Sequence, residues 1–276
     1  MNARSVCLAL GGVACGAGLF GCTFLFPVDD LDRGGNDAAT NDAEPREGGT
    51  TDDGGSDYAS EVLTDAPLAY WRFDETSGTT AKDAAGTHDG TYQNVTLGGP
   101  SAIGTGSSAT FTTPNSAVVV GNVLDIVGGA SFSLEAWAFA TSVDQNYERI
   151  VTKRDDTAPV EGWSLTNSTK NFTLDAYTDG NFAGGVASHF LTANQWWHVV
   201  VTYDRSATKL TFYLNGTQDS QSTTTVSMKG STANLVLGSL SSANGNAWRG
   251  NLDEIAIYDH ALAPDRVAAH YHAAGR

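Results

Sequence analysis

Short apolar runs separated by polar turn residues extend along the chain from position 58 to its end. The segment 131–140 shows this pattern clearly, because Phe132, Leu134 and Ala136 occupy every second position. A period of two is typical of a β-strand that buries one face against a core. Further strands are predicted at 68–73, 118–120, 196–203, 210–214, 235–237 and 252–258.

Turn residues separate these runs, and one helix is predicted near the C-terminus. Asn215-Gly216 is a strong signal for a tight hairpin turn. The segment 263–274 is the one helical pattern in this region, because Pro264 suits a first turn, and Val267 and Tyr271 share a face. Many short strands with a single terminal helix predict one all-β sandwich domain.

The charge and the cysteines narrow the classes of partner and site. The formal net charge is −16, with 15 Lys and Arg residues. This charge argues against a nucleic-acid partner, which needs a basic surface to neutralise its phosphates. Cys7, Cys15 and Cys22 are the cysteines of the chain. The predicted domain therefore has neither a disulfide framework nor a thiol nucleophile.

The first 21 residues have the organisation of a secretory signal. Arg4 precedes an uncharged apolar run over 5–21. The run ends in Leu19-Phe20-Gly21-Cys22, which resembles a bacterial lipobox. The resemblance implies a signal peptide over 1–21, cleavage before Cys22 and lipidation of that cysteine. The mature chain would then be exported and anchored to a membrane by its acyl chains.

Two other interpretations of this segment remain open. It is an ordinary secretory signal, or it is an uncleaved transmembrane helix, since apolar residues continue through 23–28. Cys15 is a second candidate for lipidation. We favour Cys22, because it lies where a signal should end. Thr23 stands where some bacteria place an aspartate for inner-membrane retention, which favours the outer membrane.

The segment 22–57 is predicted to be a disordered tether. From Asp29 to Asp57 it is rich in acidic residues and glycine, and Leu31 is its one large apolar residue. Such a segment buries too little surface to offset chain entropy, and its like charges extend it. It would hold the folded domain, 58–276, away from the lipid surface.

Four segments of the predicted domain carry a family resemblance. They are 69–75 (Ala-Tyr-Trp-Arg-Phe-Asp-Glu), 132–137 (Phe-Ser-Leu-Glu-Ala-Trp), 197–216 and 250–262. In order and spacing they resemble the laminin-G-like domains of the concanavalin A-like lectin/glucanase superfamily. The resemblance implies an antiparallel jelly roll of two curved sheets. This fold hosts lectins, adhesion modules, enzymes and spacers, so it does not by itself imply an activity.

The sequence predicts no catalytic site. Glucanases of this superfamily use a close Glu-Asp-Glu cluster on one strand, since glycoside hydrolysis needs paired carboxylates on one face. Glu135 is the only glutamate on its predicted strand. Asp253 and Glu254 are adjacent, so a regular strand would point them to opposite faces.

A structural calcium ion is a further implication of the resemblance. Related domains often hold calcium where the first turn region meets the last strands. Asp83 and Asp253 match that place best, with Asp74 and Asp89 as further candidates. Calcium takes about six to eight oxygen ligands, carboxylates and carbonyls among them. The alternative is that these aspartates cap turns and satisfy backbone donors.

Aromatic residues beside polar segments are candidates for a sugar platform, because a ring face stacks on apolar sugar C–H surfaces. Trp163, Tyr177 and Trp248 are the candidates, and Trp248 follows an Asn-Gly-Asn segment typical of a loop or rim. The alternative is that these rings cover the edge of the sandwich.

These observations favour a cell-envelope lipoprotein with a non-catalytic, lectin-like domain that binds a glycan or a protein. Two alternatives remain. The first is a structural or adhesive surface protein with no small ligand. The second is a divergent polysaccharide hydrolase or lyase, whose carboxylates would converge from separate strands.

Overall fold

The computed structural model describes residues 57–243 and 245–276. The chain divides into two units, Met1–Thr51 and Asp52–Arg276. The predicted signal peptide, Cys22 and nearly all of the predicted tether lie outside the described residues. Neither helix in the described part of the chain is long and apolar enough to cross a membrane.

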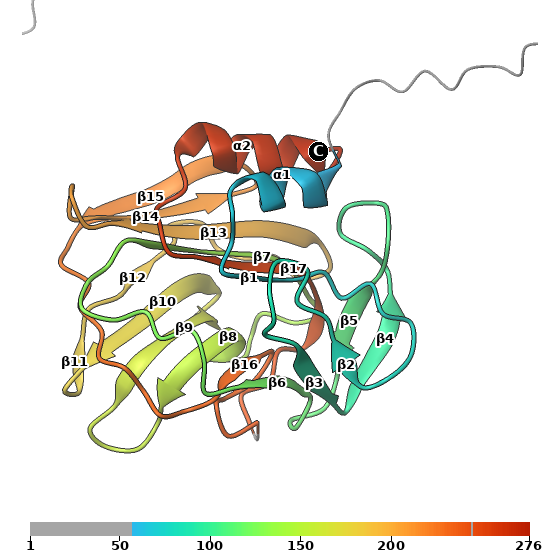
Figure 1. The fold of residues 1–276 in the computed structure, drawn as a ribbon, viewed down its shortest axis with the longest axis horizontal. Helices are drawn as coiled ribbons and strands as arrows, with labels where there is room; N and C mark the ends of the chain where they lie inside the picture. Colours follow the sequence, from blue (N-terminus) through green and yellow to red (C-terminus); the bar gives the residue numbers. More distant parts are fainter. Residues whose placement is uncertain (1–56, 244) are drawn as a thin grey trace, which may run out of the picture. The chain divides into compact units, whose positions relative to one another are not determined.

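The described domain contains two antiparallel sheets (Figure 1). The first, the helix-covered sheet, has the order β15-β14-β13-β7-β17-β5-β4, with β1 beside β17. Its strands are β1 (Ala69–Trp71), β4 (Val95–Gly99), β5 (Ser108–Phe111), β7 (Phe132–Ala140), β13 (Trp196–Asp204), β14 (Lys209–Leu214), β15 (Thr217–Thr223) and β17 (Gly250–Tyr258).

The second, the opposite sheet, has the order β11-β10-β9-β8-β16-β6-β3-β2, with β12 beside β10. Its strands are β2 (Thr80–Ala81), β3 (Gly90–Gln93), β6 (Ala117–Gly121), β8 (Glu148–Asp155), β9 (Glu161–Ser168), β10 (Asn171–Thr178), β11 (Asn181–Phe182), β12 (Gly185–Val186) and β16 (Leu235–Leu237).

The main core lies between the two sheets. In β7, Phe132, Leu134 and Ala136 point into it, and Trp163 and Leu165 of β9 meet them from the other sheet. This is the alternation that the sequence predicts, and it buries the apolar face of each sheet against the other. The predicted all-β sandwich of two antiparallel sheets is confirmed.

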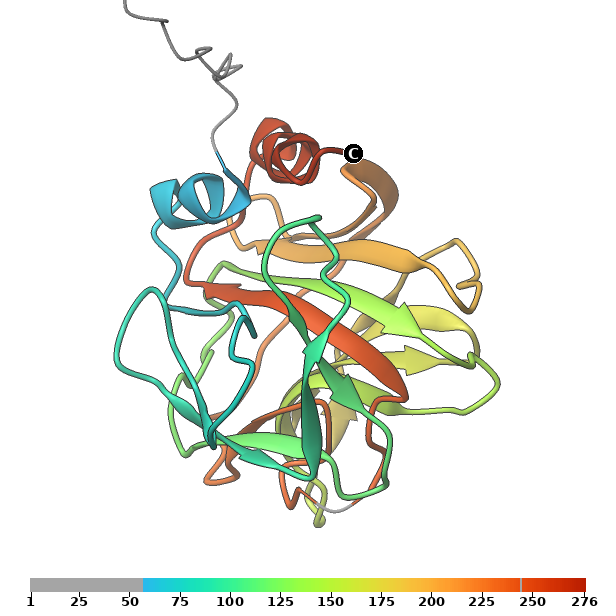
Figure 2. The ribbon, with the colours of Figure 1, turned by 90° about the vertical axis from the view of Figure 1, so that its right-hand side faces the viewer.

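Two helices, α1 (Tyr58–Thr64) and α2 (Pro264–Ala273), lie side by side on the outer face of the helix-covered sheet (Figures 1 and 2). A second apolar cluster forms beneath them, with Val62 and Val267 packed near Trp137 and Tyr258. The central strands of this sheet are therefore buried on both faces.

The C-terminal helix matches its prediction, whereas α1 does not appear in the sequence pattern. Tyr271 of α2 stacks on Trp137 at 5.8 Å between ring centroids. The expectation of a single helix is wrong, because α1 begins at Tyr58. Asp57 caps it by accepting a hydrogen bond from the Ser60 amide at 3.0 Å. Seven residues are too few to establish a helical period.

The predicted Asn215-Gly216 turn joins β14 to β15. Both residues have positive φ, 49° and 74°, as a two-residue hairpin turn requires. A Cβ atom at Gly216 would lie 2.8 Å from the Cβ of Tyr271. The position thus needs glycine for its backbone angle and for close packing against α2.

The apolar pattern does not predict β8, β9 or β10. Strands β9 and β10 alternate between core residues and polar residues that face away from the core, whereas in β8 a register shift between Arg149 and Val151 places Ile150 and Val151 together in the core. Their polar positions include charged side chains, which interrupt the apolar runs. This polar outer face lies on the side of the sandwich away from the helices (Figure 1).

Candidate functional site

Charged side chains meet on the outer face of the opposite sheet. Ser164 of β9 and Asp175 of β10 are paired in register, and their strand neighbours lie in the core, so both point outward. Arg149 Nη1 donates to Asp175 Oδ2 at 2.9 Å and to Ser164 Oγ at 2.7 Å. Arg154 Nη1 donates to the same carboxylate oxygen at 3.1 Å. One carboxylate therefore holds two guanidinium groups by charge-assisted hydrogen bonds.

These groups line a pocket of about 350 Å³, which we call the tyrosine pocket. The Arg154 guanidinium lies 5.3 Å from the centroid of the Tyr177 ring, and that of Arg149 lies 6.0 Å from Tyr147. Tyr147 is 51% exposed, so its ring is accessible to a ligand. The lining residues are Tyr147, Arg149, Arg154, Asp156, Asp175, Tyr177, Leu240 and Asn246.

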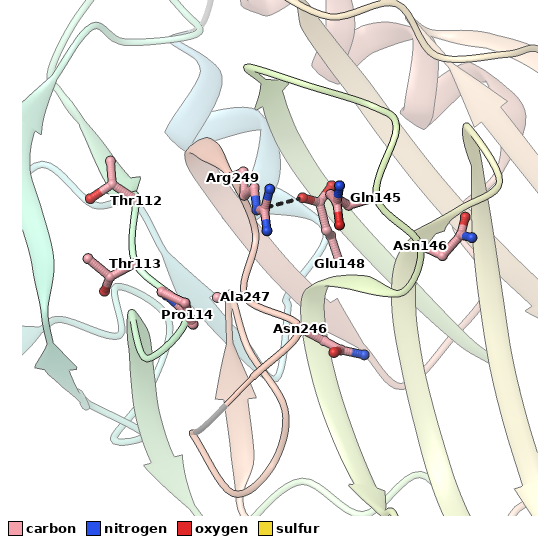
Figure 3. Close-up of a pocket in the computed structure, with 9 residues that line it drawn as sticks. All are labelled: Thr112, Thr113, Pro114, Gln145, Asn146, Glu148, Asn246, Ala247 and Arg249. Carbon is pink, nitrogen blue, oxygen red and sulfur yellow. Dashed lines mark ion pairs between the residues drawn. The ribbon is translucent and has the colours of Figure 1, made fainter.

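A second pocket, of about 270 Å³, lies beside the first, and we call it the glutamate pocket (Figure 3). Glu148 and Arg249 point toward each other in it, with Arg249 Nε 3.6 Å from Glu148 Oε1. Asn167 Nδ2 donates to the other Glu148 oxygen at 3.2 Å. Burial raises the pKa of Glu148 above its ordinary value. The lining residues are Thr112, Thr113, Pro114, Gln145, Asn146, Glu148, Asn246, Ala247 and Arg249.

The two pockets adjoin at Asn246, which lines both. The Arg149 amide donates to the Asn246 carbonyl at 2.9 Å, and Arg149 forms a parallel bridge with Ala247. The segment around Asn246 is thus fixed along the start of β8. Consecutive residues of β8 thus line different pockets: Glu148 lines the glutamate pocket and Arg149 lines the tyrosine pocket.

Several buried polar atoms on these strands have no hydrogen-bond partner within the described residues. On the outer face they are Arg149 Nε, Thr152 Oγ1, Thr166 Oγ1 and Thr173 Oγ1, whereas Glu148 Oε1, Trp163 Nε1 and Asn167 Oδ1 lie on the core side of the sheet. Buried polar groups in folded proteins are usually paired, with protein or with water. The face of β8 to β10 therefore has hydrogen-bonding capacity beyond what the chain itself uses.

The structure separates the three aromatic residues that the sequence nominates. Tyr177 lines the tyrosine pocket. Trp163 and Trp248 are each 1% exposed and belong to the core. The rim position expected for Trp248 is wrong, since its indole donates to the Phe139 carbonyl at 3.2 Å, and Trp163 is not the exposed ring that a sugar platform needs, since it alternates with outward-facing Ser164. Neither ring presents a face to a ligand.

The charged residues of the tyrosine pocket are not among the site residues that the sequence predicts. Arg149 and Arg154 belong to the run Glu-Arg-Ile-Val-Thr-Lys-Arg, which makes up all of β8 except its last residue. Arg149 and Arg154 are five positions apart, which in a regular strand would place them on opposite faces, and the register shift of β8 between Arg149 and Val151 brings both to the outer face. Their partner, Asp175, comes from a different strand, and sequence spacing does not reveal that pairing.

Two of the four candidate calcium ligands already act within turns. Asp83 accepts backbone hydrogen bonds from Tyr70 at 2.9 Å, Ala85 at 3.0 Å and His88 at 2.9 Å. Asp89 accepts from the Asp83 amide at 3.0 Å and pairs with Lys82. These contacts agree with the alternative to calcium binding, in which the aspartates cap turns and accept hydrogen bonds from backbone amides. Over residues 57–243 and 245–276, no three Asp, Glu, His or Cys side chains are grouped to hold a metal ion.

Asp253 and Asp74 lie in a second acidic environment. Asp253 Oδ2 accepts from the Ala102 amide at 2.9 Å, whereas its buried Oδ1 has no hydrogen-bond partner. Asp74 accepts from the Ser107 amide at 2.9 Å and pairs with Arg72 at 3.0 Å. Burial and the nearby negative charge of Glu254 raise the pKa of Asp253 well above its ordinary value.

Asp253 and Glu254 do not point to opposite faces, and that expectation is wrong. The register of β17 against β7 shifts between Asp253 and Ala256, and Glu254 has φ +49°. This β-bulge turns both carboxyl groups toward the helix-covered face, where Glu254 contacts the Tyr70 hydroxyl. Burial raises the pKa of Glu254 to about 8.

A third group of charges, the Glu135 cluster, lies beneath the helices. Glu135 accepts hydrogen bonds from the hydroxyls of Tyr58 at 2.9 Å and Tyr258 at 2.7 Å. His198 Nε2 lies 2.8 Å and His270 Nδ1 lies 3.1 Å from the Glu135 carboxylate. All five side chains are buried, and none of them lines either pocket. The Glu135 cluster therefore has the features of a structural network.

Comparison with known proteins identifies the family of the chain. A family model described as the concanavalin A-like lectin/glucanases superfamily matches residues 89–268. No curated protein sequence matches the chain.

Solved structures share the fold at low sequence identity. The binding domain of Paraclostridial Mosquitocidal Protein 1 is 16% identical, with a TM-score of 0.57 over 76% of this chain and 52% of that one. This chain thus matches about half of the toxin domain. Domain 4 of AbnA, an extracellular arabinanase from Geobacillus stearothermophilus solved with arabinotriose, is 20% identical, with a TM-score of 0.56 over 74% and 97%.

Two further matches differ in what they do. The botulinum neurotoxin serotype D ligand-binding domain, solved with N-acetylneuraminic acid, is 12% identical, with a TM-score of 0.57 over 77% of this chain and 52% of that one. A Trypanosoma rangeli sialidase is 13% identical, with a TM-score of 0.53 over 76% and 33%. Binding domains and an enzyme thus share this architecture, so the fold does not decide between them.

Proposed function

Because the chain belongs to the concanavalin A-like lectin/glucanases superfamily, we propose that its domain is a binding module that holds a carbohydrate at the tyrosine and glutamate pockets. The tyrosine pocket is the observation that carries this proposal. Tyr147 and Tyr177 lie there beside paired charges, on the sheet face that the helices leave free. Aromatic rings offer a surface to sugar C–H groups, and the charged groups offer donors and acceptors to hydroxyls.

The same contacts argue for binding without turnover. Glycoside hydrolysis needs one carboxyl group as an acid and another as a base or nucleophile, both directed at the glycosidic bond. The carboxylates of the two pockets are instead held by guanidinium groups: Asp175 and Asp156 by Arg154, and Glu148 by Arg249. In our proposal these carboxylates orient the arginines and accept hydrogen bonds from ligand hydroxyls.

A glycan array probed with the full chain tests the proposal. We expect retention of specific glycans, no products after incubation, and an affinity about tenfold lower in Tyr177→Ala. The matched control is Phe190→Ala, which removes an aromatic ring that is 69% exposed and lines neither pocket. A Tyr177→Ala affinity equal to that of the control would place the ligand elsewhere. A domain that binds no glycan would favour the structural or adhesive alternative.

We also propose that the chain is displayed at the cell envelope through a lipid on Cys22, which lies outside the described residues. The resemblance of Leu19-Phe20-Gly21-Cys22 to a lipobox supports this. Cells that express the chain, or Cys22→Ser, would be labelled with a palmitate analogue and fractionated. Labelled chain in the membrane fraction, lost in Cys22→Ser, is the expected result. Retention of the label by the variant would contradict lipidation at this residue.

Calcium binding is a separate proposal, for Asp253 and Asp74 rather than for Asp83 and Asp89. The buried Asp253 Oδ1 lacks a hydrogen-bond partner, and acidic neighbours surround it. A cation there would offset the repulsion between buried carboxylates. We expect calcium to raise the melting temperature of the chain and EDTA to lower it, and Asp253→Asn to abolish the difference. Equal melting temperatures in calcium and EDTA would refute the site.

A further inference from the structure

The charges that line the tyrosine pocket balance one another. Two of its lining residues, Arg149 and Arg154, are cationic, and two, Asp156 and Asp175, are anionic. Every one of them has an opposite partner within hydrogen-bond distance: Asp175 binds both arginines, and Arg154 Nε donates to Asp156 Oδ1 at 2.7 Å. The pocket therefore carries no net charge from its lining.

The glutamate pocket balances in the same way. Arg249 is its one cationic lining residue and Glu148 its one anionic lining residue, and the two face each other (Figure 3). No lysine lines either pocket. An anionic sugar entering these pockets would thus meet no cation free of a carboxylate partner.

Binding a carboxylate-bearing sugar here would require a guanidinium group to leave its partner. That exchange leaves an aspartate or glutamate without its cationic partner, and an unpaired buried charge is costly. The rest of the chain adds to the penalty, because its net charge of −16 repels anions. An uncharged sugar needs no such exchange, since its hydroxyls both donate and accept hydrogen bonds.

The two pockets also have the dimensions of two small sites rather than one large site. Their volumes, about 350 and 270 Å³, lie just above and just below the lower limit of ligand pockets, which span roughly 300 to 1,000 Å³. They adjoin at Asn246, which lines both. A ligand with one unit in each pocket would pass beside this residue.

We propose that the tyrosine and glutamate pockets are adjoining subsites for an uncharged oligosaccharide, with Asn246 at the junction. This inference rests on the proposed function, and it adds the charge class of the ligand and its minimum length of two sugar units. The paired charges reject sialylated and uronic acid glycans, and the junction favours chains over single sugars.

The first experiment compares matched neutral and acidic glycans on the full chain. The probes are lactose against 3′-sialyllactose, and galactotriose against trigalacturonate, together with an array of neutral oligosaccharides. Preference for neutral members is expected. Preference for acidic members would overturn the inference and leave the proposed function standing. Binding to no glycan would overturn both.

A charge variant sharpens this comparison. Asp156→Asn removes one of the two carboxylate partners of Arg154, the one at the side of the tyrosine pocket, where Asp156 is 35% exposed, and leaves Asp175 in place. Releasing the Nε side of that guanidinium should shift the ratio of neutral to acidic affinity by about twofold to fivefold toward acidic glycans. The control, Asp144→Asn, makes the same change of net charge at an exposed residue that lines neither pocket. Equal ratios in the two variants would contradict the role of charge pairing.

The junction is tested by ligand length. Calorimetry would compare the mono-, di- and trisaccharide of the best neutral hit with the wild-type chain and with Asn246→Gly. Glycine is chosen because Asn246 has φ +45°, which other residues adopt at a cost. The disaccharide should bind more tightly than the monosaccharide, and Asn246→Gly should weaken mainly the disaccharide. Equal affinity for monosaccharide and disaccharide would overturn the two-subsite arrangement.

Discussion

The two sheets each carry a cluster of buried charges on their outer faces, and the clusters differ in what covers them. Around Glu135, helices α1 and α2 complete the burial, and both carboxylate oxygens accept hydrogen bonds. Around Asp175 there is no covering helix, and the charged groups line a pocket. We therefore interpret the enclosed charges as structural and the charges that border solvent as the proposed ligand site.

The ring of His270 illustrates how complete the enclosure is. Its Nδ1 lies 3.1 Å from Glu135 and its Nε2 lies 2.8 Å from Asp65, at the end of α1. Because both ring nitrogens face carboxylates, only the doubly protonated imidazolium donates to both. The charge of His270 holds the pKa of Glu135 well below its usual range, although burial acts in the opposite direction. The network thereby ties α1 and α2 to the sheet.

The largest expected effect is on stability, from Glu135→Gln. The substitution removes the charge that His270 and His198 face, and breaking a buried pair in this way costs about 3 to 5 kcal/mol. Urea unfolding would measure it. Glu161→Gln is the control, since Glu161 pairs with Lys229 at the surface, and its loss should cost less than about 1 kcal/mol. Equal losses would mean that the Glu135 cluster does not stabilise the fold.

Arg149→Met gives the next largest effect. It tests whether the charged residues around Asp175, the open cluster, both stabilise the fold and bind the ligand. Arg149 is buried and bonds Asp175 and Ser164, so its loss should cost about 1.5 to 3 kcal/mol of unfolding free energy. Asp175 keeps Arg154, which makes the cost smaller than that of Glu135→Gln. Glycan affinity should fall as well, whereas Glu135→Gln should leave it unchanged. A loss of stability with full affinity would make the open cluster structural too.

The dependence of the unfolding free energy on pH should reflect the titration of the Glu135 cluster. The carboxylates raise the pKa of His270 above its ordinary value of 6.5, although burial opposes them. Its contribution is therefore complete below pH 6.5 and is lost as pH rises through the raised value. The pKa of Glu135 is lowered, so its contribution is present above its ordinary value of 4.5 and is lost as pH falls through the lowered value.

Unfolding free energies at pH 5.5, 6.5 and 8.5, which lie about one unit below, at and about two units above the ordinary histidine pKa, check this. We expect a decline toward pH 8.5 that is weaker in His270→Gln. The difference between the chains isolates His270 from the other groups that face the cluster. A parallel decline in both chains would contradict the assignment. The facing groups are Tyr58, Asp65, Tyr70, His198, Glu254, Tyr258 and Arg266.

The difference between the two sheets also explains which strands the sequence predicts and which it does not. Strands β7, β13 and β17 are buried on both faces and leave strong apolar runs, and Pro264 marks the start of α2. These elements follow from local pattern. The strands of the candidate site carry polar residues outward, so their pattern resembles that of loops.

The site itself depends on contacts that sequence spacing does not contain. Asp175 reaches Arg149 only because β9 lies between their strands and sets the register. Trp163 has polar neighbours in sequence but faces the core, because alternation along β9 decides its side. Asp253 and Glu254 share a face because of a bulge, which neighbouring residue types do not reveal. Tyr177 lines the tyrosine pocket, and its predicted role in ligand binding stays a prediction.

The smallest expected effect comes from Tyr147→Ala, and it separates binding from stability most cleanly. Tyr147 is half exposed at the tyrosine pocket, and its ring faces the Arg149 guanidinium. Removing an exposed ring should change unfolding free energy by less than about 0.5 kcal/mol. Affinity for the best glycan of the array should fall about twofold to tenfold, which is the usual contribution of one aromatic contact to binding. Calorimetry and thermal melting on the same preparation measure both. A fall in melting temperature without a fall in affinity would assign this ring to the fold, and the open cluster would then resemble the enclosed one.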